Sequence, residues 1–175
     1  LLPVLLLFQA GHLRCSNVSY LCEQKTPWAW FSLSLVVMHI AAYLGIVFFL
    51  LPFWHAVLHV LVYYGLLGFY LGVTFMVNHM GMPPVVADEV DYLRLQISTA
   101  RNIEGGWWMT ALLGGLNSQI EHHLMTGMPH YNLRKAAVIV KAFCQKHGIV
   151  YHSVGFWKAC GEVFQHMYDI ARYAA

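Results

Sequence analysis

The sequence predicts an all-α integral membrane protein, built from a helical hairpin of two membrane spans and a cytosolic helical cap. Hydrophobic residues make up 59% of the 175 residues and charged residues only 10%, whereas soluble domains carry about 25% charged residues. Residues 26–87 contain no Asp, Glu, Lys or Arg. Helical periodicity continues after this stretch, but now with polar and charged positions.

Residues 1–27 form the first predicted segment, which we expect to be cytosolic or interfacial. Its opening, "LLPVLLLFQAGHL", has no initial Met and lacks the basic n-region and small-residue cleavage site of a signal peptide. At about 13 residues it is short for a span, which needs about 20. We therefore expect an interfacial helix or the tail of a longer apolar segment, in a chain that is part of a longer protein.

Residues 28–77 form the predicted hairpin, with spans at 28–50 and 54–77. Each span exceeds the ~20 residues needed to cross ~30 Å of hydrocarbon. Residues 51–53 leave room only for a tight reversal, and Trp28 and Trp54 stand at span ends, where aromatic rings favour the interface. Two buried helices of a large soluble core are the alternative, which the length, the missing charges and the aromatic ends disfavour.

Basic residues predict the orientation of the hairpin. Lys and Arg precede the first span and follow the second, and the tip carries none. The positive-inside rule then places both termini on the cytoplasmic side. The net charge of +2, without a basic block interleaved with aromatics, argues against a nucleic-acid partner.

Residues 78–175 form the predicted helical cap. "GMPPVV" ends the second span, and helices are expected up to about residue 99, over 133–147 and at the C-terminus, with an extended stretch at 149–152. The expected capping residues are Asp88, Asn132 and Ser153 at helix starts and Gly148 at a helix end.

A polar motif follows the most apolar part of this cap. If residues 117–125 are helical, Gln119, His122 and His123 stand at i, i+3 and i+4 and project toward one side. Adjacent helical residues diverge by about 100°, so the two imidazoles can address two nearby metal ions. Neutral imidazole suits iron, whereas magnesium or calcium would call for oxygen ligands.

A second histidine pair has metal-ligand spacing but the wrong position. His55 and His59 are four residues apart in the second span. His59 precedes His79 by 20 residues, which is about 30 Å of helix and a full membrane thickness. We therefore expect this pair at the opposite face, away from His79 and His122.

Four segments together carry a family resemblance. "QIEHHL" (119–124) resembles the third histidine box of membrane fatty-acid desaturases. Its first residue is Gln where many desaturases have His, and in this it resembles the box of the front-end group, which includes Δ5, Δ6 and Δ8 acyl desaturases and bacterial linoleoyl-CoA desaturase-like proteins. "VNHMGMP" (77–83) resembles the N-H-x-x-M segment that ends the last span. "QISTARNI" (96–103) resembles Q-x-x-T-x-x-N-I. "MPHYNL" (128–133) resembles M-P-R-x-N-L, with His130 in place of the basic residue.

This resemblance implies two non-haem irons at the cytosolic mouth of four membrane spans, of which this chain would hold two. The irons would use O2 to remove hydrogens from two neighbouring methylenes, giving a cis double bond. Electrons would come from cytochrome b5 or a ferredoxin, and the substrate would be a fatty acyl-CoA or acyl-lipid in the bilayer. The membrane would be the endoplasmic reticulum or a bacterial inner membrane.

The resemblance also implies site residues. His122 and His123 correspond to catalytic iron ligands, and His79 to a ligand contributed where the last span ends. Gln119 would be a weak ligand or a donor beside one. For Glu121 the resemblance gives no role, and we expect a solvated or cation-paired carboxylate.

Two further histidine boxes of the family, HxxxH and HxxHH, have no workable counterpart here. The chain therefore resembles the C-terminal half of a desaturase, and we expect it to be inactive alone. Two alternatives remain, a related histidine-box hydroxylase and a non-enzymatic membrane scaffold. The Gln-first box and "MPHYNL" argue against the hydroxylase.

Overall fold

The computed structural model describes residues 2–84 and 90–173. The chain divides into two compact units, Leu1–Val73 and Thr74–Ala175. Most of the described residues are helical, as the sequence predicts.

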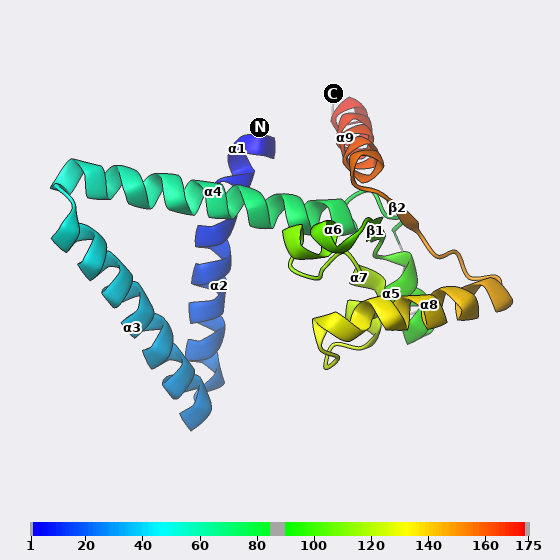
Figure 1. The fold of residues 1–175 in the computed structure, drawn as a ribbon, viewed down its shortest axis with the longest axis horizontal. Coiled ribbons are helices and arrows are strands. Elements are labelled where there is room, and N and C mark those ends of the chain that lie inside the picture. Colours follow the sequence, from blue (N-terminus) through cyan, green and yellow to red (C-terminus); the bar gives the residue numbers. More distant parts are fainter. Residues whose placement is uncertain (1, 85–89, 174–175) are drawn as a thin grey trace. The chain divides into compact units, whose positions relative to one another are not determined.

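Two long helices, α3 (Pro27–Leu50) and α4 (Phe53–His79), meet at a sharp turn (Figure 1). Thr26 caps α3, because its Oγ1 accepts a hydrogen bond from Ala29 N at 3.1 Å. Both helices are long and apolar enough to cross a membrane. In the most apolar 18-residue stretch of each helix, only 6% of α3 and 28% of α4 is buried within the chain, which disfavours the helices of a soluble core. The two predicted helices are confirmed, and the second continues two residues further than expected, to His79.

The N-terminal segment contains two helices, α1 (Leu2–Leu6) and α2 (Gln9–Gln24). α2 packs against α3. The first turns of the chain also approach α4 closely, because a Cβ added to Gly68 would lie 2.4 Å from the carbonyl oxygen of Leu7. A glycine at this position therefore allows backbone-to-backbone contact.

The described part of the second unit contains the end of α4, five further helices and two short strands. The five further helices are α5 (Tyr92–Ser98), α6 (Trp107–Leu112), α7 (Gln119–Leu124), α8 (His130–Lys146) and α9 (Phe156–Tyr173). Strands β1 (Asn102–Glu104) and β2 (Ser153–Gly155) pair in parallel, with Ile103 opposite Val154. The second unit is therefore mainly helical, with two short strands that the predicted fold class did not include, and the expected extended stretch at 149–152 directly precedes β2.

Several predicted helix ends differ from the structure. Asp91 caps α5 by accepting a hydrogen bond from Arg94 N at 2.9 Å, and Asp88 lies outside the described residues. α8 starts at His130, so Asn132 lies in its first turn instead of capping it. Ser153 belongs to β2, where ladder pairing replaces capping. Gly148, at φ +64°, ends α8 as expected.

A small apolar core fixes the position of α7. Ile97 of α5, Ala100, Ile120 of α7 and Cys144 of α8 are fully buried against one another. Burial of apolar surface stabilises the folded state by about 25 cal/mol per Å². α7 is thereby held between α5 and α8.

Candidate metal centre

Residues 99–103 connect the end of α4 to the start of α7. Arg101 N donates to Asn78 O at 3.0 Å, and Ile103 N donates to Asn117 O at 2.9 Å. Asn102 Oδ1 accepts from Ile120 N at 2.9 Å. One short segment thus brings His79 and the Gln-x-x-His-His motif together, although they lie 40 or more residues apart in sequence.

Three side chains meet at this junction. Nε2 of His79 and Nε2 of His123 lie 3.4 Å apart. The Gln119 amide nitrogen lies 3.1 Å from the first and 3.0 Å from the second. Gln119 and His123 share one face of α7 at i and i+4, as predicted, and the last turn of α4 supplies His79.

The opposite nitrogen of each ring is held by an oxygen. His123 Nδ1 lies 3.1 Å from Gln96 Oε1, and His79 Nδ1 lies 3.3 Å from the carbonyl oxygen of Thr99. Because these oxygens accept hydrogen bonds, each Nδ1 carries the proton and each Nε2 presents a lone pair. Orientation of this kind is typical of histidines that bind metals.

The His122 ring neighbours two other imidazoles. Its ring centroid lies 6.0 Å from that of His123 and 5.5 Å from that of His130. His122 Nδ1 is buried without a hydrogen-bond partner, whereas His130 Nδ1 donates to Gly114 O at 3.0 Å. Within the part of the chain that the structure describes, no three His, Cys, Asp or Glu side chains come together closely enough to hold a metal ion.

Electrostatics favour neutral imidazoles on α7. Burial lowers the pKa of both His122 and His123, and neighbouring histidines lower each pKa further. The neutral form is the one that binds metals, so the surroundings of the two rings suit ligation.

Glu121 differs from expectation. Its side chain is fully buried and neither solvated nor paired with a cation. Asn102 Nδ2 donates to it at 2.7 Å and Tyr151 OH at 3.0 Å. Burial raises the pKa of Glu121, an effect that these two hydrogen bonds oppose.

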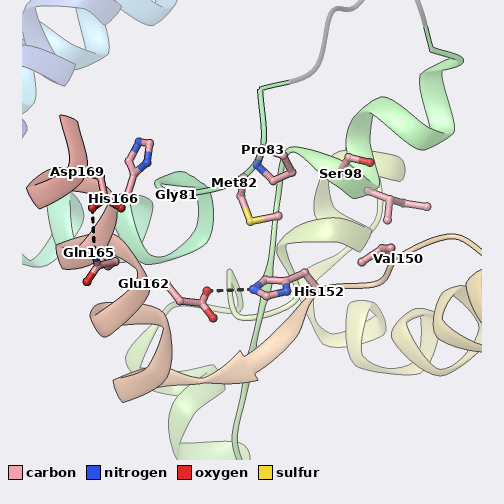
Figure 2. Close-up of a pocket in the computed structure, with 11 residues that line it drawn as sticks. Gly81, Met82, Pro83, Ser98, Val150, His152, Glu162, Gln165, His166 and Asp169 are labelled. Atoms are coloured by element: carbon pink, nitrogen blue, oxygen red, sulfur yellow. Dashed lines mark hydrogen bonds and ion pairs between the residues drawn. The ribbon is translucent and has the colours of Figure 1, made fainter. Parts of the chain in front are cut away.

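A second polar cluster lies beside a cavity of about 610 Å³. Figure 2 shows Glu162 and His152 side by side in the lining of this cavity, with His152 Nε2 3.0 Å from Glu162 Oε2. The same oxygen accepts a hydrogen bond from the fully buried Arg101. His152 is thus half-buried and paired with a carboxylate. Gly81, at φ +81°, leaves room here, since an added Cβ would lie 3.4 Å from Arg101 Nη2.

His55 and His59 lie on the part of α4 that belongs to the first unit, where the His59 ring is 6.3 Å from that of Tyr43. Asn78 is fully buried, and its Nδ2 donates to Thr74 O at 2.9 Å.

Motif reasoning had not assigned roles to Gln96, Thr99, Asn102 or Tyr151. A signal for the first three was present, since all belong to "QISTARNI". Gln96 is the acceptor for His123, Thr99 is the acceptor for His79, and Asn102 donates to Glu121. Tyr151 has no comparable signal.

Known proteins resemble the chain over most of its length. The family model described as fatty acid desaturase matches residues 2–155. An acyl-lipid (9-3)-desaturase of Physcomitrium patens is 36% identical over 140 residues, which are 80% of this chain and 26% of that protein. A Delta(5) fatty acid desaturase of Caenorhabditis elegans is 34% identical over 142 residues, which are 77% of this chain and 31% of that protein.

A Delta 8-(E)-sphingolipid desaturase of Lachancea kluyveri is 40% identical over 76 residues, which are 43% of this chain and 13% of that protein. The chain therefore spans less than a third of the length of these three relatives. No solved structure matches it. Because the family model covers most of the sequence, including every motif residue described above, the chain belongs to the fatty acid desaturase family.

Proposed function

We propose that this chain supplies the third histidine box, His79 and the cytosolic cap of a di-iron, O2-dependent membrane desaturase that inserts a cis double bond into a fatty acyl chain. One observation carries the proposal. The Nε2 atoms of His79 and His123 lie 3.4 Å apart, and each ring is fixed from behind by an oxygen.

The residues present fit part of an iron site. Two metal–nitrogen bonds of about 2.1 Å at a tetrahedral angle place the nitrogens about 3.4 Å apart, as found for His79 and His123. Gln119 Oε1 and His122 Nδ1 are buried without partners, and a buried polar atom of this kind calls for an ion, a water or a further ligand. Imidazole nitrogens are suitable ligands for iron.

His79, His122 and His123 would be ligands shared between the two irons, with Gln119 as a weak ligand or as a donor to the rings. Gln96 and Thr99 keep the protons on the far nitrogens, so that Nε2 stays available. When bound, the two irons supply the oxidising power needed for unactivated C–H bonds.

The wider setting is part of the same proposal. Residues 28–77 would cross the membrane as a hairpin, with both termini and the 78–175 cap in the cytoplasm. The membrane would be the endoplasmic reticulum or a bacterial inner membrane. The substrate would be an acyl-CoA or acyl-lipid, and cytochrome b5 or a ferredoxin would supply electrons. Without the other two histidine boxes, the chain alone should bind iron weakly and form no double bonds.

A chimera tests the proposal. The matching 140-residue portion of the Physcomitrium patens desaturase would be replaced by this chain, and the chimera expressed in yeast supplied with that enzyme's fatty acid. We expect a new unsaturated product in fatty-acid methyl esters analysed by gas chromatography and mass spectrometry. Immunoblotting confirms that the chimera and the parent accumulate equally.

Hydroxylated product would favour the hydroxylase alternative. An inert chimera at normal abundance, beside an active parent, would favour a scaffold and contradict the proposal.

A further inference from the structure

Glu121 lies next to the two box histidines, yet its hydrogen bonds run elsewhere. Its carboxylate is fully buried and accepts from Asn102 Nδ2 at 2.7 Å and from Tyr151 OH at 3.0 Å. A buried carboxylate is costly unless it is well hydrogen-bonded, so this arrangement is a specific feature of the fold.

The three side chains form a closed network. Asn102 Nδ2 also lies 2.6 Å from Tyr151 OH, and Asn102 Oδ1 accepts from Ile120 N at 2.9 Å. Asn102 of β1 therefore contacts two successive residues of α7, namely the backbone of Ile120 and the side chain of Glu121. Tyr151, which precedes β2, completes the network from the other direction.

α7 needs such external support. It has six residues, and Ser118 at its start makes no side-chain capping hydrogen bond. Isolated helices this short are not stable, so tertiary contacts must fix its rotation about its own axis. A rotation by one residue position, about 100°, would turn His123 away from His79.

We propose that Glu121 is a positioning residue, whose carboxylate locks the rotation of α7 through Asn102 and Tyr151 and thereby aims His122 and His123. Its importance for a metal centre rests on the proposed function, but the aim of the rings is a property of the metal-free chain. Glutamine at position 121 preserves the network, because its carbonyl oxygen can accept from Asn102 while its amide donates to the Tyr151 oxygen. Alanine removes the acceptor for one amide hydrogen of Asn102 and for the hydroxyl hydrogen of Tyr151.

Carbethoxylation of histidine by diethyl pyrocarbonate measures the aim directly. The detergent-solubilised metal-free chain would be labelled, and the rate at the peptide containing His122 and His123 followed by mass spectrometry. Glu121→Ala should raise this rate about tenfold, the factor that corresponds to about 1.4 kcal/mol. Glu121→Gln should stay close to the wild type. Glu104→Ala, which removes an exposed carboxylate from β1, is the matched control and should leave the rate unchanged.

Equal rates for Glu121→Ala and Glu104→Ala would overturn the proposal, and so would a Glu121→Gln variant as reactive as Glu121→Ala. If Glu121→Ala does not fold, Tyr151→Phe removes one donor and keeps the ring. Its rate should rise by a smaller factor, and an unchanged rate in that folded variant would also overturn the proposal. Absorption of added Co²⁺ serves as a separate readout. Wild-type spectra without ligand-field bands would count against the iron site, while the labelling result on Glu121 would still stand.

Discussion

The two units of the chain keep their shapes by different means. In Leu1–Val73, the buried hydrophobic side chains among the described residues are small or medium in size, namely Ala10, Ala29, Val47 and Ala56. All described buried polar or charged side chains lie in Thr74–Ala175: Thr74, Asn78, Arg101, Asn102, Asn117, Ser118, Gln119 and Glu121.

This difference shows which solvent each unit is built for. Exposed apolar side chains cover α3 and α4, so these helices need a surrounding that solvates hydrocarbon. The second unit contains buried groups that only specific partners can satisfy, so its geometry depends on matching hydrogen bonds. Substitutions in the first unit should therefore change the free energy of membrane insertion. Substitutions in the second unit should lower stability by removing hydrogen-bond partners of buried polar groups.

The largest expected effect is at the histidine box. In the chimera, His123→Ala should reduce product by more than about a hundredfold, because even residues that only support a metal ligand contribute about 10–100-fold. Gas chromatography of yeast fatty acids measures the loss. His147→Ala, an exposed histidine outside the site, is the control and should keep normal product. Equal activity of both variants would show that the short distance between the His79 and His123 rings is not needed for desaturation.

Breaking the buried ion pair should come next. Glu162→Ala leaves the fully buried Arg101 without its carboxylate, which should cost about 3–5 kcal/mol of unfolding free energy. Thermal unfolding in detergent, followed by tryptophan fluorescence, reports the change. Arg94→Ala breaks an exposed pair whose side chains are 59% and 60% accessible, and should cost less than about 1 kcal/mol. If both variants lose a similar free energy of unfolding, burial does not strengthen the Arg101–Glu162 pair.

A charge placed on an exposed apolar side chain tests the solvent difference directly. Val37→Arg, near the middle of α3, should impair membrane insertion by about 2.5–3.5 kcal/mol. Ile139 on α8 is also exposed but lies in the cap, and Ile139→Arg should change stability by no more than about 0.5 kcal/mol. Glycosylation-reporter insertion assays measure the first and thermal unfolding the second. If Val37→Arg inserts as well as the wild type, the hairpin is not a membrane element.

The smallest effect should be at the close approach within the first unit. Gly68→Ala would press a methyl group against the carbonyl oxygen of Leu7 and should cost about 1–3 kcal/mol. Gly65→Ala meets only Leu7 Cδ2 at 4.0 Å, so the better helix propensity of alanine should dominate, at up to about 1 kcal/mol of stabilisation. Opposite shifts in melting temperature would confirm the contact. Two shifts of the same sign would contradict it.

Sequence reasoning succeeded where a feature is local. Missing charges and apolar length predicted α3 and α4, and i, i+3, i+4 spacing placed Gln119, His122 and His123 on one short helix. These features depend on neighbouring residues alone.

Features that depend on distant partners were missed. Glu121 is buried because Asn102 and Tyr151 supply donors from 19 and 30 residues away, and no pattern around position 121 indicates them. His152 is paired with Glu162 for a similar reason. The two strands escaped prediction because three-residue segments carry little periodicity, and their pairing spans about 50 residues.

The parallel pairing of β1 with β2 also sets an order of assembly. α7 lies in the stretch of chain between the two strands, and translation proceeds from the N-terminus. His122 and His123 are therefore synthesised before Tyr151 and β2. Under the proposed function, a polypeptide halted upstream of residue 151 would carry the box histidines and the Asn102–Glu121 hydrogen bond but would lack the Tyr151 donor, so the hydrogen-bond network that positions α7 is complete only once this part of the chain has been made.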